Sequence, residues 1–342
     1  MLSARVEREK AEAFRKELSS LHLVDTKVLI IEDKRFVFIP LAAMPSQGLL
    51  REFGATLEDA SFPPRKSKKD PIDLILDVTM IPVSLKPALP RKWEQFGDVL
   101  VLRLDHSLDR YEAPVAKAYA SVLGAKTVLR DVGGISGDLR QPVIRTILGS
   151  DTIATHLENG IKYRFDAAKI MFSSGNVEER TRMAETRCDD ETIVDMFAGI
   201  GYFSIPLAVY QKPRKVIACE LNPIAHSFLV ENIGLNKVGH AVDPILGDNR
   251  QLEGDSFADR VIMGYVKTTH EFLPAALRLV KDRGMIHYHE TCPNELLPER
   301  PIQHLMEGAK GAEVVVERMK EIKSYSPGVS HIVVDARIFK SS

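Results

Sequence analysis

Apolar and polar positions follow a strand–helix rhythm from about residue 176 to the end of the chain. Short apolar runs, typical of buried strands, alternate with segments of helical periodicity. We predict strands at 192–197, 215–220, 243–246, 260–263 and 284–289, and helices at 202–210, 223–235 and 268–280. This alternation indicates a doubly wound, mostly parallel sheet. Segments 313–323 and 331–338, joined by a tight turn, predict a final antiparallel pair.

The first 170 residues have a different pattern. We predict an amphipathic helix at 3–21, strands at 27–31, 35–39, 99–104, 127–130, 143–148, 152–157 and 161–165, and a helix at 113–123. Gly124 follows that last helix as a C-cap would, and Glu158–Gly160 is a hairpin signal. The chain is therefore expected to form three domains: a small α+β domain at 1–65, an α+β middle domain at 70–170 and an α/β domain at 171–342.

Composition narrows the class of protein. Hydrophobic residues make up 44% and charged residues 27% of the 342 residues, the balance of a soluble globular protein. The sequence has no apolar run of about 20 residues for a membrane span and no secretory signal. Its three cysteines are isolated, which favours a cytoplasmic location and argues against a disulfide framework or a structural metal site.

The net charge of -1 conceals two basic clusters, at 65–69 and 91–93. The first contains Lys66, Lys68 and Lys69. Such clusters are compatible with a phosphate-backbone partner, but on charge alone a solvated loop is the favoured interpretation. Charge alone does not identify the partner.

The most informative segment runs from Asp195 to Phe203. A buried strand enters a turn with Gly199 and Gly201, and a helix begins directly afterwards, so backbone N–H groups can approach a ligand closely. Ser204 replaces the third glycine of the dinucleotide fingerprint, which makes a pyrophosphate ligand the weaker interpretation.

Polar side chains end the next two strands. Glu220 lies 19 positions after Gly201, where a carboxylate can accept hydrogen bonds from both ribose hydroxyls of an adenosine. Asp248 and Asn249 end the third strand and can contact the adenine amino group. Because carboxyl ends of parallel strands share one edge of a sheet, the sequence predicts a nucleoside site there.

With these residues in place, the chain resembles a tRNA-modifying family with two sister groups. The resemblance rests on VDMFAGIGYFSIPLA, CELNPIAHSFLVENIGLNKV, LGDNR, GMIHYHE and KSYSPGVSHIVVDARI, and covers at least residues 140–340. One group comprises the guanosine-37 N1-methyltransferases, and the other comprises aminocarboxypropyltransferases of wybutosine synthesis. The resemblance implies a class I methyltransferase fold, S-adenosylmethionine as donor, no metal, and tRNA as partner. It also suggests that residues 1–60 bind the tRNA elbow.

Two departures favour the second group. Where the methyltransferases resemble one another in an Asn-Leu-Pro turn, this chain has Met263–Val266, and Ser174–Gly175 stands in place of their Pro-Arg pair. The resemblance then implies transfer of the 3-amino-3-carboxypropyl arm to carbon 7 of 4-demethylwyosine at position 37 of tRNA(Phe), with release of methylthioadenosine.

The resemblance also implies roles for individual residues. We expect Ser173 and Arg180 to anchor the polar arm, with Glu179 and Arg182 reinforcing that loop, although a solvated charged helix is the alternative.

The carbon nucleophile must lose a proton, and His289 and Glu290, beside His287, are the candidate catalytic residues. Phe197 or Tyr265 is expected to stack on adenine or on the flipped base, although Phe197 also suits an ordinary core.

Other functions stay open at this point. A guanosine-37 N1-methyltransferase would use the same donor site with another arm geometry. A tRNA-binding module with a relict pocket would need no cofactor, which the complete set of glycines and carboxylates argues against. A small-molecule aminocarboxypropyltransferase would not need the N-terminal 170 residues.

Overall fold

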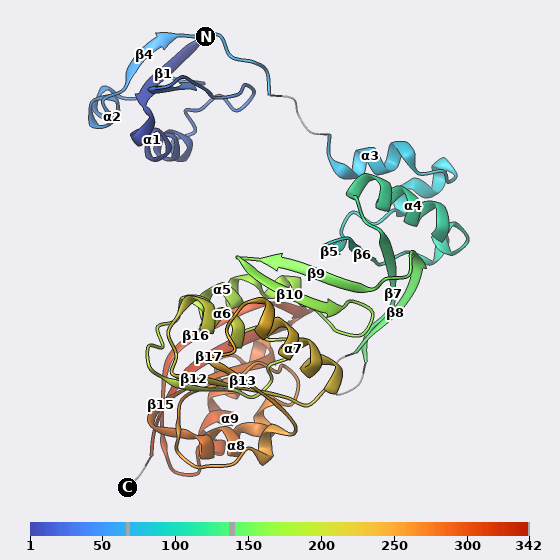
Figure 1. The fold of residues 1–342 in the computed structure, drawn as a ribbon, viewed down its shortest axis with the longest axis vertical. Coiled ribbons are helices and arrows are strands. Elements are labelled where there is room, and N and C mark those ends of the chain that lie inside the picture. Colours follow the sequence, from blue (N-terminus) through green and yellow to red (C-terminus); the bar gives the residue numbers. More distant parts are fainter. Residues whose placement is uncertain (66–68, 137–140, 341–342) are drawn as a thin grey trace. The chain divides into compact units, whose positions relative to one another are not determined.

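The computed structural model describes residues 1–65, 69–136 and 141–340. The chain forms two compact units, Met1–Asp70 and Pro71–Ser342 (Figure 1). The described residues contain no helix long and apolar enough to cross a membrane. They also contain no group of three or more histidine, cysteine or acidic side chains that could hold a metal ion. Lys66 and Lys68 of the predicted basic cluster lie outside the described residues.

The first unit is a four-stranded sheet in the order β2-β3-β1-β4, with two helices. Its elements are β1 (Leu2–Glu7), α1 (Arg8–Ser20), β2 (Ile31–Glu32), β3 (Phe36–Pro40), α2 (Gln47–Phe53) and β4 (Thr56–Asp59). The prediction of a helix from residue 3 was wrong for its first turn. Residues 2–7 form the strand that pairs with both β3 and β4, and Ala4 and Val6 alternate into the core.

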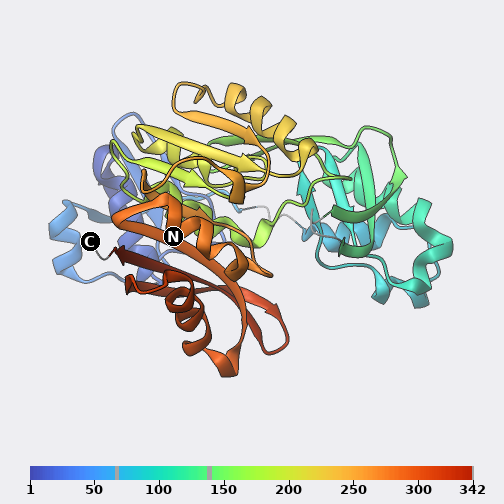
Figure 2. The same cartoon turned by 90° about the horizontal axis from the view of Figure 1, so that it is seen from below.

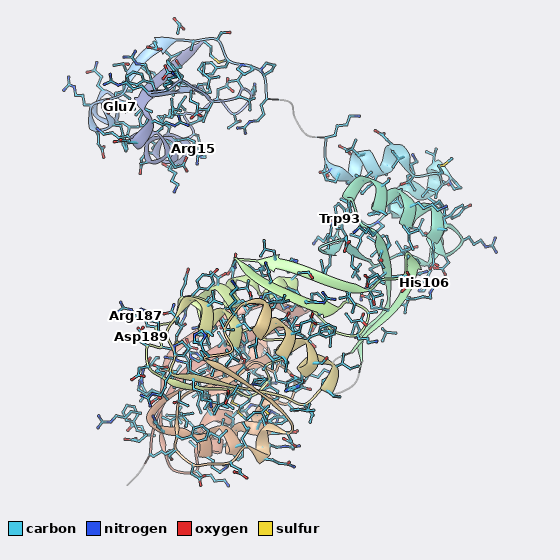
Figure 3. All side chains as sticks on the ribbon, viewed as in Figure 1. Glu7, Arg15, Trp93, His106, Arg187 and Asp189 are labelled. Atoms are coloured by element: carbon cyan, nitrogen blue, oxygen red, sulfur yellow. The ribbon has the colours of Figure 1, made fainter. Side chains whose placement is uncertain are left out.

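The second unit begins with a smaller sheet in the order β5-β6-β7-β8. Its elements are α3 (Pro71–Val78), β5 (Glu94–Phe96), β6 (Val99–Leu102), α4 (Glu112–Leu123), β7 (Thr127–Ser136) and β8 (Gln141–Leu148). Gly124 ends α4 with φ 72°, the left-handed conformation that the sequence signal predicts. Trp93, labelled in Figure 3, lies in this part of the chain. Its ring packs edge-on against that of Tyr119 on α4, with 5.9 Å between ring centroids. The predicted hairpin is present as β9 (Ile153–Glu158) and β10 (Ile161–Asp166).

The rest of this unit is a seven-stranded sheet in the order β13-β12-β11-β14-β15-β17-β16. Its strands are β11 (Thr192–Asp195), β12 (Lys215–Glu220), β13 (Val242–Leu246), β14 (Ala258–Met263), β15 (Val280–Pro293), β16 (Glu313–Ser326) and β17 (Val329–Phe339). The first five strands are parallel to one another, and β17 is antiparallel to both β15 and β16. This is the class I methyltransferase fold that the resemblance implies.

Helices cover both faces of the large sheet. They are α5 (Val177–Glu185), α6 (Ser204–Tyr210), α7 (Pro223–Leu235), α8 (Leu273–Leu279) and α9 (Glu299–Ala309). Figure 2 shows α7 and α9 on opposite sides of the sheet. Side chains such as Ile193 and Ile262 point to a core beneath α6 and α7. Their neighbours Val194 and Val261 point to a second core beneath α8 and α9. Helix α9 was not predicted from the sequence.

Candidate functional site

A cavity of about 550 Å³ opens at the carboxyl ends of β11, β12 and β14, the edge where the sequence predicts ligand binding. Its wall includes all seven residues predicted to bind the cofactor and one of the two predicted to be catalytic: Ser173, Arg180, Phe197, Gly199, Glu220, Asp248, Asn249 and His289. Glu290 is not part of this wall. The fold therefore brings these eight predicted site residues, which are spread from position 173 to position 289, together at one site.

The turn after β11 depends on its glycines. Gly199 and Gly201 have φ values of 57° and 98°, and a Cβ on Gly201 would lie 2.4 Å from Ile205 Cδ1. Asp195 is fully buried beneath this turn, and burial raises its pKa to about 6. Its carboxyl group accepts a hydrogen bond from Ser204 Oγ at 2.6 Å. Ser204, which replaces the third glycine of the dinucleotide motif, thus fixes the turn.

Glu220 is held in place by the backbone. Its two carboxylate oxygens accept hydrogen bonds from the N–H groups of Gly199, at 2.8 Å, and Asn222, at 2.7 Å. Burial raises the pKa of the carboxyl group, and these two bonds oppose that effect. Each oxygen accepts a further hydrogen bond readily, so Glu220 presents an oriented acceptor pair to a ribose.

Asp248 and Asn249 follow β13 and line the part of the cavity that is expected to hold adenine. Asn249 Nδ2 donates to the carbonyl oxygen of Met196 at 2.6 Å. Its buried Oδ1 has no hydrogen-bond partner within the described part of the chain, so it needs a donor such as the adenine amino group. Asp248 caps the following turn, and its hydrogen bonds with Arg250 lower the pKa of its carboxyl group.

Aromatic side chains form the apolar wall beside these groups. The rings of Phe197 and Tyr265 stack at 5.2 Å with an interplanar angle of 16°, and Phe272 meets Phe197 edge-on. Phe203 lies next to Gly264, where a Cβ would come within 2.9 Å of Phe203 Cε2. A larger residue at 264 would therefore displace the Phe203 ring.

The contacts of Arg180 and Ser173, the residues expected to anchor the polar arm of the donor, differ from the sequence expectation. Arg180 is buried, and its guanidinium forms a bidentate ion pair with Glu158 at 2.6 and 2.7 Å and donates to the Ser173 carbonyl at 2.9 Å. Lys323 on β16 was not predicted, yet it lines the cavity and donates from Nζ to Ser173 Oγ at 2.8 Å. Gly175 leaves room for it, because a Cβ there would lie 3.3 Å from Lys323 Cδ.

Three segments of the chain match known protein domains. Residues 154–317 match the TRM5/TYW2 methyltransferase domain, residues 74–152 the TYW2 N-terminal domain, and residues 4–47 the tRNA methyltransferase 5 N-terminal domain. The chain is 50% identical over 263 residues to the tRNA(Phe) (4-demethylwyosine(37)-C(7)) aminocarboxypropyltransferase of Pyrococcus horikoshii, covering 76% of this chain and 94% of that protein. The chain belongs to the TRM5/TYW2 family.

Both branches of the TRM5/TYW2 family are represented among its relatives. The tRNA (guanine(37)-N(1))-methyltransferase Trm5b of Pyrococcus abyssi is 33% identical over 341 residues, which are 98% of this chain and 99% of that protein. The crystal structure of P. horikoshii TYW2 in complex with MeSAdo aligns with a TM-score of 0.72 at 47% identity, covering 79% of this chain and all of the other. The M. jannaschii TYW2 structure with AdoMet aligns with a TM-score of 0.61 at 41% identity, covering 73% of this chain and all of that one.

Within this TRM5/TYW2 family member, the two residues predicted to be catalytic lie on opposite faces of β15. His289 points to the face covered by α5 and lines the cavity. Glu290 points to the other face, where its carboxylate accepts hydrogen bonds from Tyr288 Oη at 2.7 Å and Arg300 Nε at 2.9 Å. Side chains alternate along a strand, so neighbours such as these cannot share a site. We therefore do not propose a catalytic role for Glu290.

The side chains of Glu179 and Arg182 do not lie on a solvated helix face, which was the alternative interpretation. Both are largely buried, and they form a bidentate ion pair in which Arg182 Nε donates at 2.8 Å. Arg182 also donates to Asp335 of β17 at 2.7 Å. This face of α5 thus places charged side chains in the interior of the protein, next to His289.

Proposed function

We propose that the protein transfers the 3-amino-3-carboxypropyl group of S-adenosylmethionine to carbon 7 of 4-demethylwyosine at position 37 of tRNA(Phe), releasing methylthioadenosine. The observation that carries the proposal is the segment Met263–Val266, whose last three residues line the cavity. It has neither the asparagine amide nor the proline of the sister methyltransferases, and Gly264 instead admits the Phe203 ring. The 50% identity to an aminocarboxypropyltransferase supports the same conclusion.

The donor fits the cavity through its adenosine half. Glu220 accepts hydrogen bonds from the ribose hydroxyls, because its carboxylate is already oriented by two backbone N–H groups. The unpartnered Oδ1 of Asn249 accepts from the adenine amino group, with Asp248 beside it. Gly199 lets the backbone approach the ligand, and Phe197 supplies apolar contact.

The arm determines the product. A sulfonium has three activated carbon atoms, and the one that faces the nucleophile reacts, since orientation supplies an effective molarity of about 10⁵–10⁸ M. Ser173 and Lys323 hold the carboxylate of the arm, because the ammonium of Lys323 supplies a positive charge beside the Ser173 hydroxyl. Arg180 contributes by holding the Ser173 backbone, since its guanidinium is paired with Glu158.

We also propose that tRNA binding is divided among three parts of the chain. Residues 171–342 carry out the transfer and residues 70–170 position the anticodon arm. Residues 1–65 bind elsewhere on the tRNA, an assignment supported by the match of residues 4–47 to the tRNA methyltransferase 5 N-terminal domain. The exposed Arg91 and Lys92 are candidate phosphate contacts, and tRNA as substrate implies a cytoplasmic location.

A guanosine-37 N1-methyltransferase is the second candidate, because Trm5b matches nearly the whole chain. Chromatography of the nucleoside by-product separates the two reactions. After incubation with S-adenosylmethionine and tRNA(Phe) carrying 4-demethylwyosine, our proposal predicts methylthioadenosine. Accumulation of S-adenosylhomocysteine with tRNA carrying guanosine at position 37 would establish the second candidate instead.

A further inference from the structure

An ionic network links α5 with the strands β14, β15 and β17 and adjoins the cavity at His289. It contains the carboxylates of Glu179, Glu191 and Asp335, and the guanidinium groups of Arg182 and Arg260. Glu179 is fully buried and Arg260 is 8% exposed. Two histidines adjoin this network, His287 and His289, and they are the candidate bases for a proton that comes from the cavity.

His287 cannot hold that proton. Its Nε2 lies 2.6 Å from Arg260 Nη1, and its Nδ1 lies 2.6 Å from Asp335 Oδ1. A guanidinium only donates, so Nε2 must be the acceptor and Nδ1 must carry the hydrogen that Asp335 receives. The tautomer of His287 is thereby fixed in the neutral form.

His289 is placed to hold it. Its Nε2 is buried without a hydrogen-bond partner among the described residues, 3.7 Å from Glu179 Oε1. Its Nδ1 lies 3.1 Å from Nε2 of His331, and its ring stacks on Phe203. Burial, together with the charge of Arg182, lowers the pKa of His289 to about 3, so the resting imidazole is neutral. His289 and His331 both line the cavity.

We infer that Glu179, His289 and His331 form a relay that removes the proton from the attacked carbon of the acceptor. The relay rests on the proposed function. His331 takes the proton at the cavity wall and passes the proton on its Nε2 to Nδ1 of His289. The carboxylate of Glu179 faces the opposite nitrogen of His289 and stabilises the imidazolium that results.

The step balances without any further reagent. The π electrons of carbon 7 form the bond to the methylene carbon of the arm, while the carbon–sulfur electron pair leaves with sulfur, which becomes a neutral thioether. The ring is then cationic, and its carbon–hydrogen electron pair restores the aromatic system when the proton leaves to His331. A carbon acid of this kind is strong, so a weakly basic imidazole suffices to remove its proton.

The relay is tested with His331→Asn and Glu179→Gln in the full-length protein. Single-turnover rates are measured with S-adenosylmethionine and tRNA(Phe) carrying 4-demethylwyosine, with either hydrogen or deuterium at carbon 7. We expect each variant to slow the transfer, His331→Asn by about 10²-fold or more, and the deuterated acceptor to react more slowly still, because proton loss then limits the rate. His304→Gln, on α9 and outside the cavity wall, serves as the histidine control and should react as the wild type does.

Methylthioadenosine affinity separates the relay from a structural role. Both variants should bind methylthioadenosine within about twofold of the wild type. If one variant fails to bind, the other decides the outcome. A rate within about twofold of the wild type, or a slower rate without an isotope effect, would overturn the relay while the wild type still produces methylthioadenosine. If the wild type itself produces S-adenosylhomocysteine, the proposed function fails rather than the relay.

Discussion

At strands β15 and β17, the two faces of the large sheet bury different kinds of side chains. Beneath α8 and α9, strands β15 and β17 contribute Ile286, Tyr288 and Val334 to an apolar core that includes Leu305. On the other face, the alternate residues of the same strands are His287, His289 and Asp335, and α5 covers them with charged side chains. Neighbouring residues of two strands therefore serve different purposes, as the alternation of strand side chains allows.

This difference bears on how each face contributes to the stability of the protein. Apolar burial stabilises the sheet without specific partners, whereas a buried ionic network tolerates no missing partner. A network of that kind adds little net stability compared with a well-packed core. We therefore expect the network to matter for the reaction more than for stability, to which the apolar core beneath α8 and α9 contributes more.

Removing one charge should have the largest effect on stability. Arg182→Met leaves the buried carboxylates of Glu179 and Asp335 without their shared cation, so we expect unfolding to become easier by about 3–5 kcal/mol. Urea unfolding measures this. Arg214→Met, which removes the cation of an exposed pair with Asp190, is the matched control and should cost at most about 1 kcal/mol. Equal losses in the two variants would contradict the buried network.

A cavity in the apolar face should cost slightly less and leave the reaction intact. Leu305 is fully buried beneath α9, so Leu305→Ala should destabilise the protein by about 3 kcal/mol. Its methylthioadenosine affinity and single-turnover rate should match those of the wild type at a temperature where both are folded. A large loss of rate in this variant would mean that the two faces are not functionally separate.

The ionic face should also give the protein a distinct acid response. Burial raises the pKa of Asp335, but the His287 hydrogen bond and the charge of Arg182 outweigh it and lower that pKa to about 2. A lowered carboxyl pKa contributes stability that is present above the unfolded value, near 4, and is lost as the pH falls through about 2. The contribution is about 2 kcal/mol. Urea unfolding of the wild type and of Asp335→Asn between pH 5 and 2 should show their difference shrinking by that amount; a constant difference would rule out this linkage.

The smallest effect concerns the arm end of the cavity. Lys323→Met should weaken S-adenosylmethionine binding about tenfold, because a charged contact to the arm carboxylate is lost. Methylthioadenosine has no such carboxylate, so its affinity should not change, and calorimetry with both ligands provides the control. A parallel loss for both ligands would show that Lys323 shapes the cavity rather than holding the arm.

Local patterns in the sequence predicted much of the donor site. A strand, a two-glycine turn and carboxylates at the ends of successive strands are all read within short windows, and Glu220 and Asn249 lie at the expected edge. The same windows did not reveal α9, whose first turn contains Pro301, or the strand at residues 2–7.

Contacts between distant segments could not be predicted in this way. The partner of Arg180 is Glu158, on β9 and 22 positions earlier, and Lys323 reaches Ser173 across 150 positions. The separation of His289 from Glu290 was within reach of the sequence, because strand alternation already placed them on opposite faces.

The central claim is that the arm of S-adenosylmethionine, and not its methyl group, reaches the tRNA. The most direct measurement uses S-adenosylmethionine labelled with ¹⁴C in the arm carboxyl group and with ³H in the methyl group, incubated with tRNA(Phe) carrying 4-demethylwyosine. The account predicts ¹⁴C in the tRNA and ³H in the released nucleoside. Incorporation of ³H into the tRNA, with ¹⁴C left in the released nucleoside, would contradict it.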